Sequence, residues 1–229
     1  MHYEAVETKF LATPEKGAVS ALLVRPAEAH FLLALAHGAS TNMRHRTLQA
    51  IAERLADVGI ATFRYNFPYA ENGAARDPQH VCTTTVRAAV AAAQSAAPGL
   101  PLLAGGSSFG GRMTSTAASE RPLDGVSGLV FFAFPLHQAG KPETKRADHL
   151  SAVTVPMLFL SGTRDTLADL DLLRSVCRKL GPRATLHTLD GADHGFRTLR
   201  RSRQNGEDVF VEMARVIRMW AGGIYSAGG

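Results

Sequence analysis

The sequence predicts an α/β fold in which helices cover both faces of a mostly parallel, twisted sheet. Short apolar or β-branched segments alternate with longer amphipathic ones, and Gly, Pro or Asp stands at the ends of the short segments. Several of the short segments are apolar on both faces, which is typical of parallel strands buried between helices. We expect about seven to eight strands and a single domain over residues 1–229.

Seven segments have the composition of strands. Each is apolar or β-branched and is bounded by turn-forming residues. They are Ala18–Val24, Phe31–His37, Ala61–Phe67, Leu100–Gly105, Gly128–Phe134, Val155–Ser161 and Ala184–Leu189. Open α/β sheets bind ligands at the carboxyl ends of their strands. We therefore expect the functional residues in the loops that follow these segments.

Four segments have the apolar periodicity of amphipathic helices. The first covers residues 48–58 and ends at Gly59, since glycine commonly follows a last helical turn. Asp77 is expected to cap a second, alanine-rich helix that has Pro78 in its first turn and ends near Pro98. Two further apolar stripes predict helices that face the core: Leu173, Val176, Cys177 and Leu180, then Val209, Met213, Val216 and Trp220.

The composition excludes several protein classes. Of the 229 residues, 45% are hydrophobic and 20% are charged, which is unlike a disordered chain. The longest apolar stretches, such as Phe31–Ala36 and Leu129–Pro135, are too short to span a membrane. Residues Met1–Phe10 lack the features of a secretory signal, so a cytoplasmic protein is expected. Cys82 and Cys177 stand far apart and outside any C-x-x-C pattern, which favours core thiols over a disulfide or a metal site.

The net charge of +5 does not indicate a nucleic-acid partner, because acidic residues are interspersed with the basic ones. One local basic cluster stands out, formed by Arg197, Arg200, Arg201 and Arg203. It is compatible with an anionic substrate or partner, although a solvated loop is the commoner explanation. We expect neither a nucleic acid nor a membrane as partner. The oligomeric state, monomer or homodimer, stays open.

A candidate nucleophile follows the predicted strand Leu100–Gly105. The sequence there reads Gly106-Ser107-Ser108-Phe109-Gly110, a G-x-S-x-G pattern between a strand and an apparent helix. Glycines two residues before and two after allow a sharp turn that lifts the central serine above the sheet. Only Ser108 has this spacing, so it is preferred over Ser107. A glycine-rich turn capped by serine would be the simpler interpretation without this strand and helix context.

A serine hydroxyl needs a base to remove its proton and a third group to orient that base. Asp165 follows the strand Val155–Ser161, and His194 follows the strand Ala184–Leu189. Alone, the aspartate is compatible with a helix cap and the histidine with an exposed loop. Together with Ser108 they occur in the order serine, aspartate, histidine, each just after a predicted strand. Asp193 is a weaker candidate for the acid, because adjacent residues seldom reach each other's side chains.

Positions at and after the ends of other predicted strands supply further candidate site residues, together with Phe109 beside Ser108. The Phe109 N–H and a second N–H at Ala39 are candidates for the oxyanion hole that acyl transfer requires. His37, at the end of its strand, is expected to brace this loop. Three residues at or just after the ends of predicted strands are candidates for the substrate pocket, although ordinary packing explains them equally well: Tyr65, Pro68 and His137.

At these residues the chain resembles the α/β-hydrolase superfamily, and within it the small lidless members similar to dienelactone hydrolase. The motifs that carry the resemblance are His37 to Ser40, Gly106 to Gly110, Gly162 to Asp165 and Asp193 to Phe196. The resemblance implies the α/β-hydrolase fold. Too few residues separate Phe109 from the strand at Val155 for a large cap domain. Dienelactone hydrolases typically use a cysteine nucleophile where this chain has Ser108, so the resemblance implies a serine esterase without specificity for lactones.

We therefore expect a serine hydrolase of the carboxylesterase type that cleaves a carboxylic ester or a related acyl bond through an acyl-enzyme on Ser108. The expected partner is a small-molecule acyl substrate, and the chemistry requires no metal or organic cofactor. Two alternatives stay open. One is a non-catalytic scaffold or binding module with this fold, and the other is an acidic-partner or nucleic-acid binder that uses the segment Arg197–Arg203.

Overall fold

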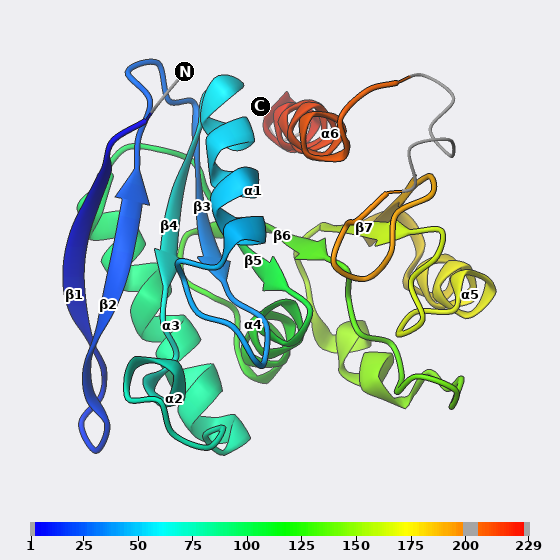
Figure 1. Cartoon of the computed structure of the whole chain (residues 1–229), viewed down its shortest axis with the longest axis horizontal. Helices are drawn as coiled ribbons and strands as arrows, with labels where there is room; N and C mark the ends of the chain where they lie inside the picture. The colour runs from blue at the N-terminus through cyan, green and yellow to red at the C-terminus, as the bar shows by residue number, and fades with distance from the viewer. Residues whose placement is uncertain (1–2, 199–205, 227–229) are drawn as a thin grey trace.

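The computed structural model describes residues 3–198 and 206–226. Its strands are β1 (Ala5–Thr13), β2 (Gly17–Val24), β3 (Phe31–Ala36), β4 (Ile60–Tyr65), β5 (Leu102–Ser107), β6 (Val126–Phe132), β7 (Met157–Gly162) and β8 (Ala184–Leu189). They form one sheet in the order β1-β2-β4-β3-β5-β6-β7-β8 (Figure 1). β2 is antiparallel to both of its neighbours, β1 and β4, and all other neighbouring strands are parallel. The predicted α/β class with a mostly parallel sheet is confirmed.

Helices cover both faces of this sheet. They are α1 (Arg46–Asp57), α2 (Pro68–Glu71), α3 (Gln79–Ala96), α4 (Phe109–Glu120), α5 (Leu170–Leu180) and α6 (Val209–Ser226), with 3₁₀ turns η1 (Lys145–Ala152) and η2 (Gly181–Arg183). α1 and α6 lie on one face and α3, α4 and α5 on the other. Side chains of β3 alternate between the two cores: Leu33 and Leu35 face α1, whereas Leu32 and Ala34 face the opposite core. No helix in the described ranges is long and apolar enough to cross a membrane.

The chain connections reverse direction at one point in the sheet, between β3 and β5. β3 and β5 are neighbours, and the chain leaves β3 for β4 on one side before it returns to β5 on the other. The loops that follow β3 and β5 therefore diverge at the carboxyl edge. Such a switch point is where open α/β sheets hold their ligands.

Two local features differ from the sequence-based expectation. β1 was not among the seven predicted strands, because it lies at the sheet edge and most of its side chains are exposed, so it lacks an apolar pattern. Asp77 does not cap α3. Pro78 is the residue before the first turn, and the Asp77 carboxylate instead accepts a hydrogen bond from the Tyr69 N–H and pairs with Lys16. It thus fixes the loop between β4 and α3.

Candidate active site

Ser108 occupies the sharp turn between β5 and α4. Its backbone has a φ of 49° and a ψ of −113°, a left-handed conformation that non-glycine residues rarely adopt. The turn is possible because α4 begins directly against the end of β3. A Cβ on Gly110 would lie 2.5 Å from the carbonyl oxygen of His37 and 2.7 Å from that of Ala36. Only glycine fits there, and the strained turn holds the Ser108 side chain above the sheet.

A chain of hydrogen bonds joins Ser108, His194 and Asp165. Ser108 Oγ lies 2.9 Å from His194 Nε2, and His194 Nδ1 lies 2.8 Å from Asp165 Oδ2. The Asp165 side chain is inaccessible to solvent, whereas that of His194 is 26% exposed. Asp165 Oδ1 also accepts a hydrogen bond from the Leu167 N–H, which orients the carboxylate. The structure therefore brings together the three residues that the sequence singled out.

The loops after β7 and β8 interlock, which explains how Asp165 reaches His194. The Thr163 N–H donates to the Leu189 carbonyl and the Arg164 N–H donates to the Ala192 carbonyl. A Cβ on Gly162 would lie 2.2 Å from that same Ala192 oxygen, so β7 must end in glycine for the two loops to meet.

The turn that carries His194 is stabilised by hydrogen bonds among its own residues. Asp193 Oδ1 accepts hydrogen bonds from the N–H groups of Gly195 and Arg197, and the Asp193 carbonyl accepts one from Phe196. Phe196 has a φ of 65° and a buried side chain, which anchors the turn in the core. Asp193 thus shapes the loop while Asp165 contacts the His194 ring.

His37 braces the loop after β3, as its place at the strand end predicts. It is fully buried, and its Nε2 accepts a hydrogen bond from the Phe67 N–H. Because a backbone N–H can only donate, Nδ1 carries the proton and donates to the Gly38 carbonyl at 2.7 Å. Burial lowers the pKa of His37 to about 4. The ring is therefore neutral at pH 7 and joins the loops after β3 and β4.

The Gly38–Ala39 peptide is oriented by contacts to its carbonyl oxygen. That oxygen accepts from His37 and from both the N–H and the hydroxyl of Thr41. Since a trans peptide is planar, the Ala39 N–H points away from this oxygen and its partners. A Cβ on Gly38 would lie 3.8 Å from the Ser107 carbonyl oxygen, so the loop lies against the end of β5. Phe109 provides the first N–H of α4 beside Ser108.

The three candidates for the substrate pocket lie within the protein rather than at the site opening. Tyr65 is 1% exposed and packs against Phe10 and Phe67. Pro68 is buried at the start of α2. His137 is 3% exposed, and both ring nitrogens have backbone partners, the Gln138 carbonyl and the Asp169 N–H. Its contacts support the packing explanation, because they join the loops after β6 and β7.

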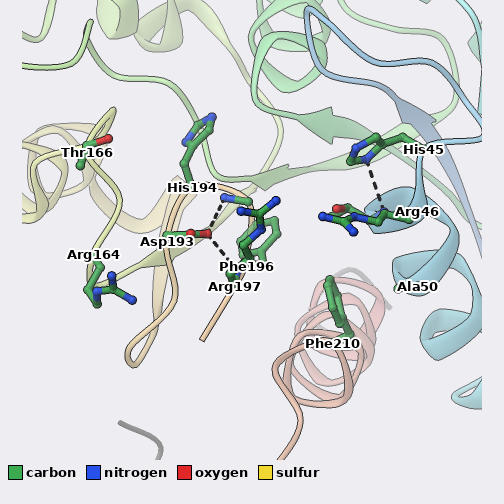
Figure 2. A pocket seen from close by; sticks show the side chains of 12 residues that line it. His45, Arg46, Ala50, Arg164, Thr166, Asp193, His194, Phe196, Arg197 and Phe210 are labelled. Atoms are coloured by element: carbon green, nitrogen blue, oxygen red, sulfur yellow. Dashed lines mark hydrogen bonds between the residues drawn. The ribbon is translucent and has the colours of Figure 1, made fainter. Parts of the chain in front are cut away.

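A cavity of about 860 Å³ lies beside His194 (Figure 2). Its walls come from the first turn of α1, the loop after β7, the turn after β8 and the start of α6. The side chains that shape it include His45, Arg46, Arg164, His194, Arg197 and Phe210. Sequence reasoning flagged Arg197 only as part of a basic cluster, whose other members, Arg200, Arg201 and Arg203, lie outside the described residues. It missed Arg46 and Arg164, although Arg164 directly precedes Asp165.

The comparisons with known proteins agree with this architecture. A family model described as an alpha/beta hydrolase domain matches residues 29–222. The chain belongs to this family. Among solved structures, this α/β hydrolase is similar to a dienelactone hydrolase from Anabaena variabilis, with a TM-score of 0.74, 18% identity, and coverage of 96% of this chain and 97% of that one. The predicted fold without a cap domain is confirmed.

Two other solved structures have the same fold. One is a serine hydrolase without a lid from Xanthomonas campestris, with a TM-score of 0.71, 20% identity and 96% of each chain covered. The other is the protein Est1E from Butyrivibrio proteoclasticus, with a TM-score of 0.69, 16% identity, and coverage of 96% of this chain and 99% of that one. At these identities the likeness concerns the fold, so the chemistry has to be argued from the site itself.

Proposed function

We propose that this α/β hydrolase is a serine hydrolase that cleaves a carboxylic ester or a related acyl bond through an acyl-enzyme on Ser108. The observation that carries the proposal is the hydrogen-bonded chain from Ser108 Oγ through His194 to the buried Asp165. A non-catalytic scaffold would have no need to keep these three groups in contact. Each lies in a loop from a different strand, and the strained turn at Ser108 is maintained at a cost in stability.

The reaction follows from this geometry. His194 Nε2 accepts the Ser108 proton as Oγ attacks the acyl carbon, and Asp165 stabilises the imidazolium that forms. The N–H groups of Phe109 and Ala39 donate to the oxygen that becomes negative in the tetrahedral intermediate. His194 then protonates the leaving group, whose bond to the acyl carbon breaks. A water molecule, deprotonated by His194, releases the acid and restores the Ser108 hydroxyl.

Fluorophosphonate labelling tests this proposal without assuming a substrate. The probe should add its mass at Ser108 in the wild-type protein and in Ser107→Ala, but not in Ser108→Ala. The Ser107→Ala variant is a matched control, because it removes a neighbouring hydroxyl of the same turn. Hydrolysis of p-nitrophenyl acetate should follow the same pattern. Folded wild-type protein that neither reacts with the probe nor hydrolyses the ester would support the scaffold alternative.

A further inference from the structure

Arginines from three separate segments line the cavity beside His194. Arg46 begins α1, Arg164 follows β7, and Arg197 stands three residues after His194. In Figure 2, Arg46 and Arg197 extend toward the same space from opposite sides, and Phe210 lies below them. Arginine side chains that are far apart in the sequence thus line one cavity that also reaches His194.

The described residues provide no ion pair for these three arginines. Asp193 is the only carboxylate among the cavity residues, and its Oδ1 already accepts two backbone N–H groups of its own turn. Arg164 donates to the Gly191 carbonyl, which is uncharged. Residues 199–205, which precede α6, contain no Asp or Glu that could supply a charge partner.

Some other arginines at the surface of the described residues do have an acidic partner. Arg44, two residues before Arg46, pairs with Glu7, and Arg174 pairs with Asp171. The first turn of α1 contains no acidic residue, so no carboxylate there offsets the positive end of its dipole, and its cap is the His45 ring, which accepts from the Thr47 N–H. Guanidinium groups that share a cavity repel one another unless an anion lies between them, and their planar donors match carboxylate and phosphate oxygens. The cavity therefore has the electrostatics of an anion site.

The position of the cavity indicates which part of a substrate would carry the anion. His194 lines the cavity and Ser108 does not. In the proposed reaction, His194 hands its proton to the departing oxygen, so the leaving group departs on the histidine side. Phe210 also lines the cavity and provides apolar surface for its carbon skeleton, and its ring packs against the buried Phe196 at a centroid distance of 6.4 Å.

We propose that the substrate is an ester whose alcohol portion carries a carboxylate or phosphate, and that Arg46 and Arg197 bind this group beside His194. This inference rests on the proposed serine hydrolase function. Arg164, at the far side of the same cavity, adds to the positive potential. The ester bond breaks between the acyl carbon and the alcohol oxygen, His194 protonates that oxygen, and the anionic alcohol leaves through the cavity.

Matched pairs of esters test the proposal. 4-Acetoxybenzoate and its methyl ester differ by one negative charge on the leaving group, and 4-acetoxyphenyl phosphate carries phosphate in that place. We expect kcat/KM to be about tenfold or more higher for 4-acetoxybenzoate than for its methyl ester, mainly through a lower KM. Whether the phosphate ester exceeds 4-acetoxybenzoate then distinguishes the two anions. Added NaCl should reduce the preference for either anionic ester, because it screens exposed charges.

Substitutions of the arginines test whether Arg46 and Arg197 cause the preference for anionic esters. The double variant Arg46→Gln/Arg197→Gln should bring the ratio of the two kcat/KM values close to one. Arg46→Lys should keep part of the preference, because it retains the charge without the planar donors. Arg44→Gln is the matched control: it removes an arginine of the same loop outside the cavity, and we expect it to leave the ratio unchanged. Because the substituted arginines are exposed, the thermal midpoints should stay close to that of the wild type.

The outcomes separate this inference from the proposed function. Hydrolysis of the neutral ester without a preference for anionic leaving groups would overturn the inference and leave the proposed function intact. A preference for mono-p-nitrophenyl succinate over p-nitrophenyl butyrate, lost in the same double variant, would place the anion on the acyl side and overturn the leaving-group assignment. If no ester is hydrolysed and fluorophosphonate does not react, the proposed function fails first.

Discussion

Acidification should destabilise this protein through His37. Its pKa is lowered from 6.5 to about 4 by burial, so an unfolded chain binds a proton in this interval that the folded chain does not. The neutral ring therefore contributes stability that is fully present above pH 6.5 and is lost as the pH falls toward 4. One pKa unit corresponds to about 1.4 kcal/mol, so the loss amounts to about 2 kcal/mol between pH 7 and pH 5.

Urea unfolding of the wild type and of His37→Gln at both pH values isolates this contribution, because the other titrating groups are common to the two proteins. At pH 7 the variant should be less stable by about 1–3 kcal/mol, since the Phe67 N–H and the Gly38 carbonyl lose buried partners. At pH 5 the difference should shrink by about 2 kcal/mol. A difference that is the same at both pH values would refute the assignment of a neutral, buried His37.

Three further predictions concern other parts of the protein. Asp165→Asn should lower kcat for p-nitrophenyl acetate by about 10³-fold or more by favouring the wrong imidazole tautomer, and a wild-type kcat would contradict the role of this carboxylate. Gly110→Ala should lower the free energy of unfolding by about 2–4 kcal/mol, because the added Cβ would meet the end of β3. The control Gly223→Ala, at an exposed helical glycine, should raise the free energy of unfolding by up to about 1 kcal/mol. Equal urea midpoints for the two variants would show that the close approach at Gly110 is absent. Burial raises the pKa of Cys82 to about 12, so iodoacetamide at pH 8 should alkylate it only after unfolding, and mass spectrometry of the native protein checks this.

The sequence predicts strand bounds best where an apolar run is enclosed by turn-forming residues. β8 has the bounds that its composition predicts, and β3 ends one residue before the predicted His37, because apolar runs between turn residues leave few alternatives. The loops of Ser108, Asp165 and His194 could be placed for the same reason, since each directly follows such a run.

Features that depend on tertiary neighbours could not be read in this way. β1 is a strand because it pairs with β2, although its own side chains are mostly exposed. Asp77 resembles a helix cap in the sequence, yet Lys16 and the Tyr69 N–H compete for its carboxylate. Arg46 has no local signal, because its place in the wall of the cavity that His194 also lines depends on how α1 packs against the sheet.

The separation of the site residues along the chain has a consequence for refolding. Ser108 and His194 are 86 residues apart, and β6 and β7 lie between their strands in the sheet. The hydrogen bond between them requires the four parallel strands β5 to β8 to be paired, and non-local parallel pairing is slow compared with helix formation. Recovery of hydrolysis after dilution from denaturant should therefore lag behind the return of helical circular dichroism. Activity in this protein would then report that the sheet is assembled from β5 to its β8 edge.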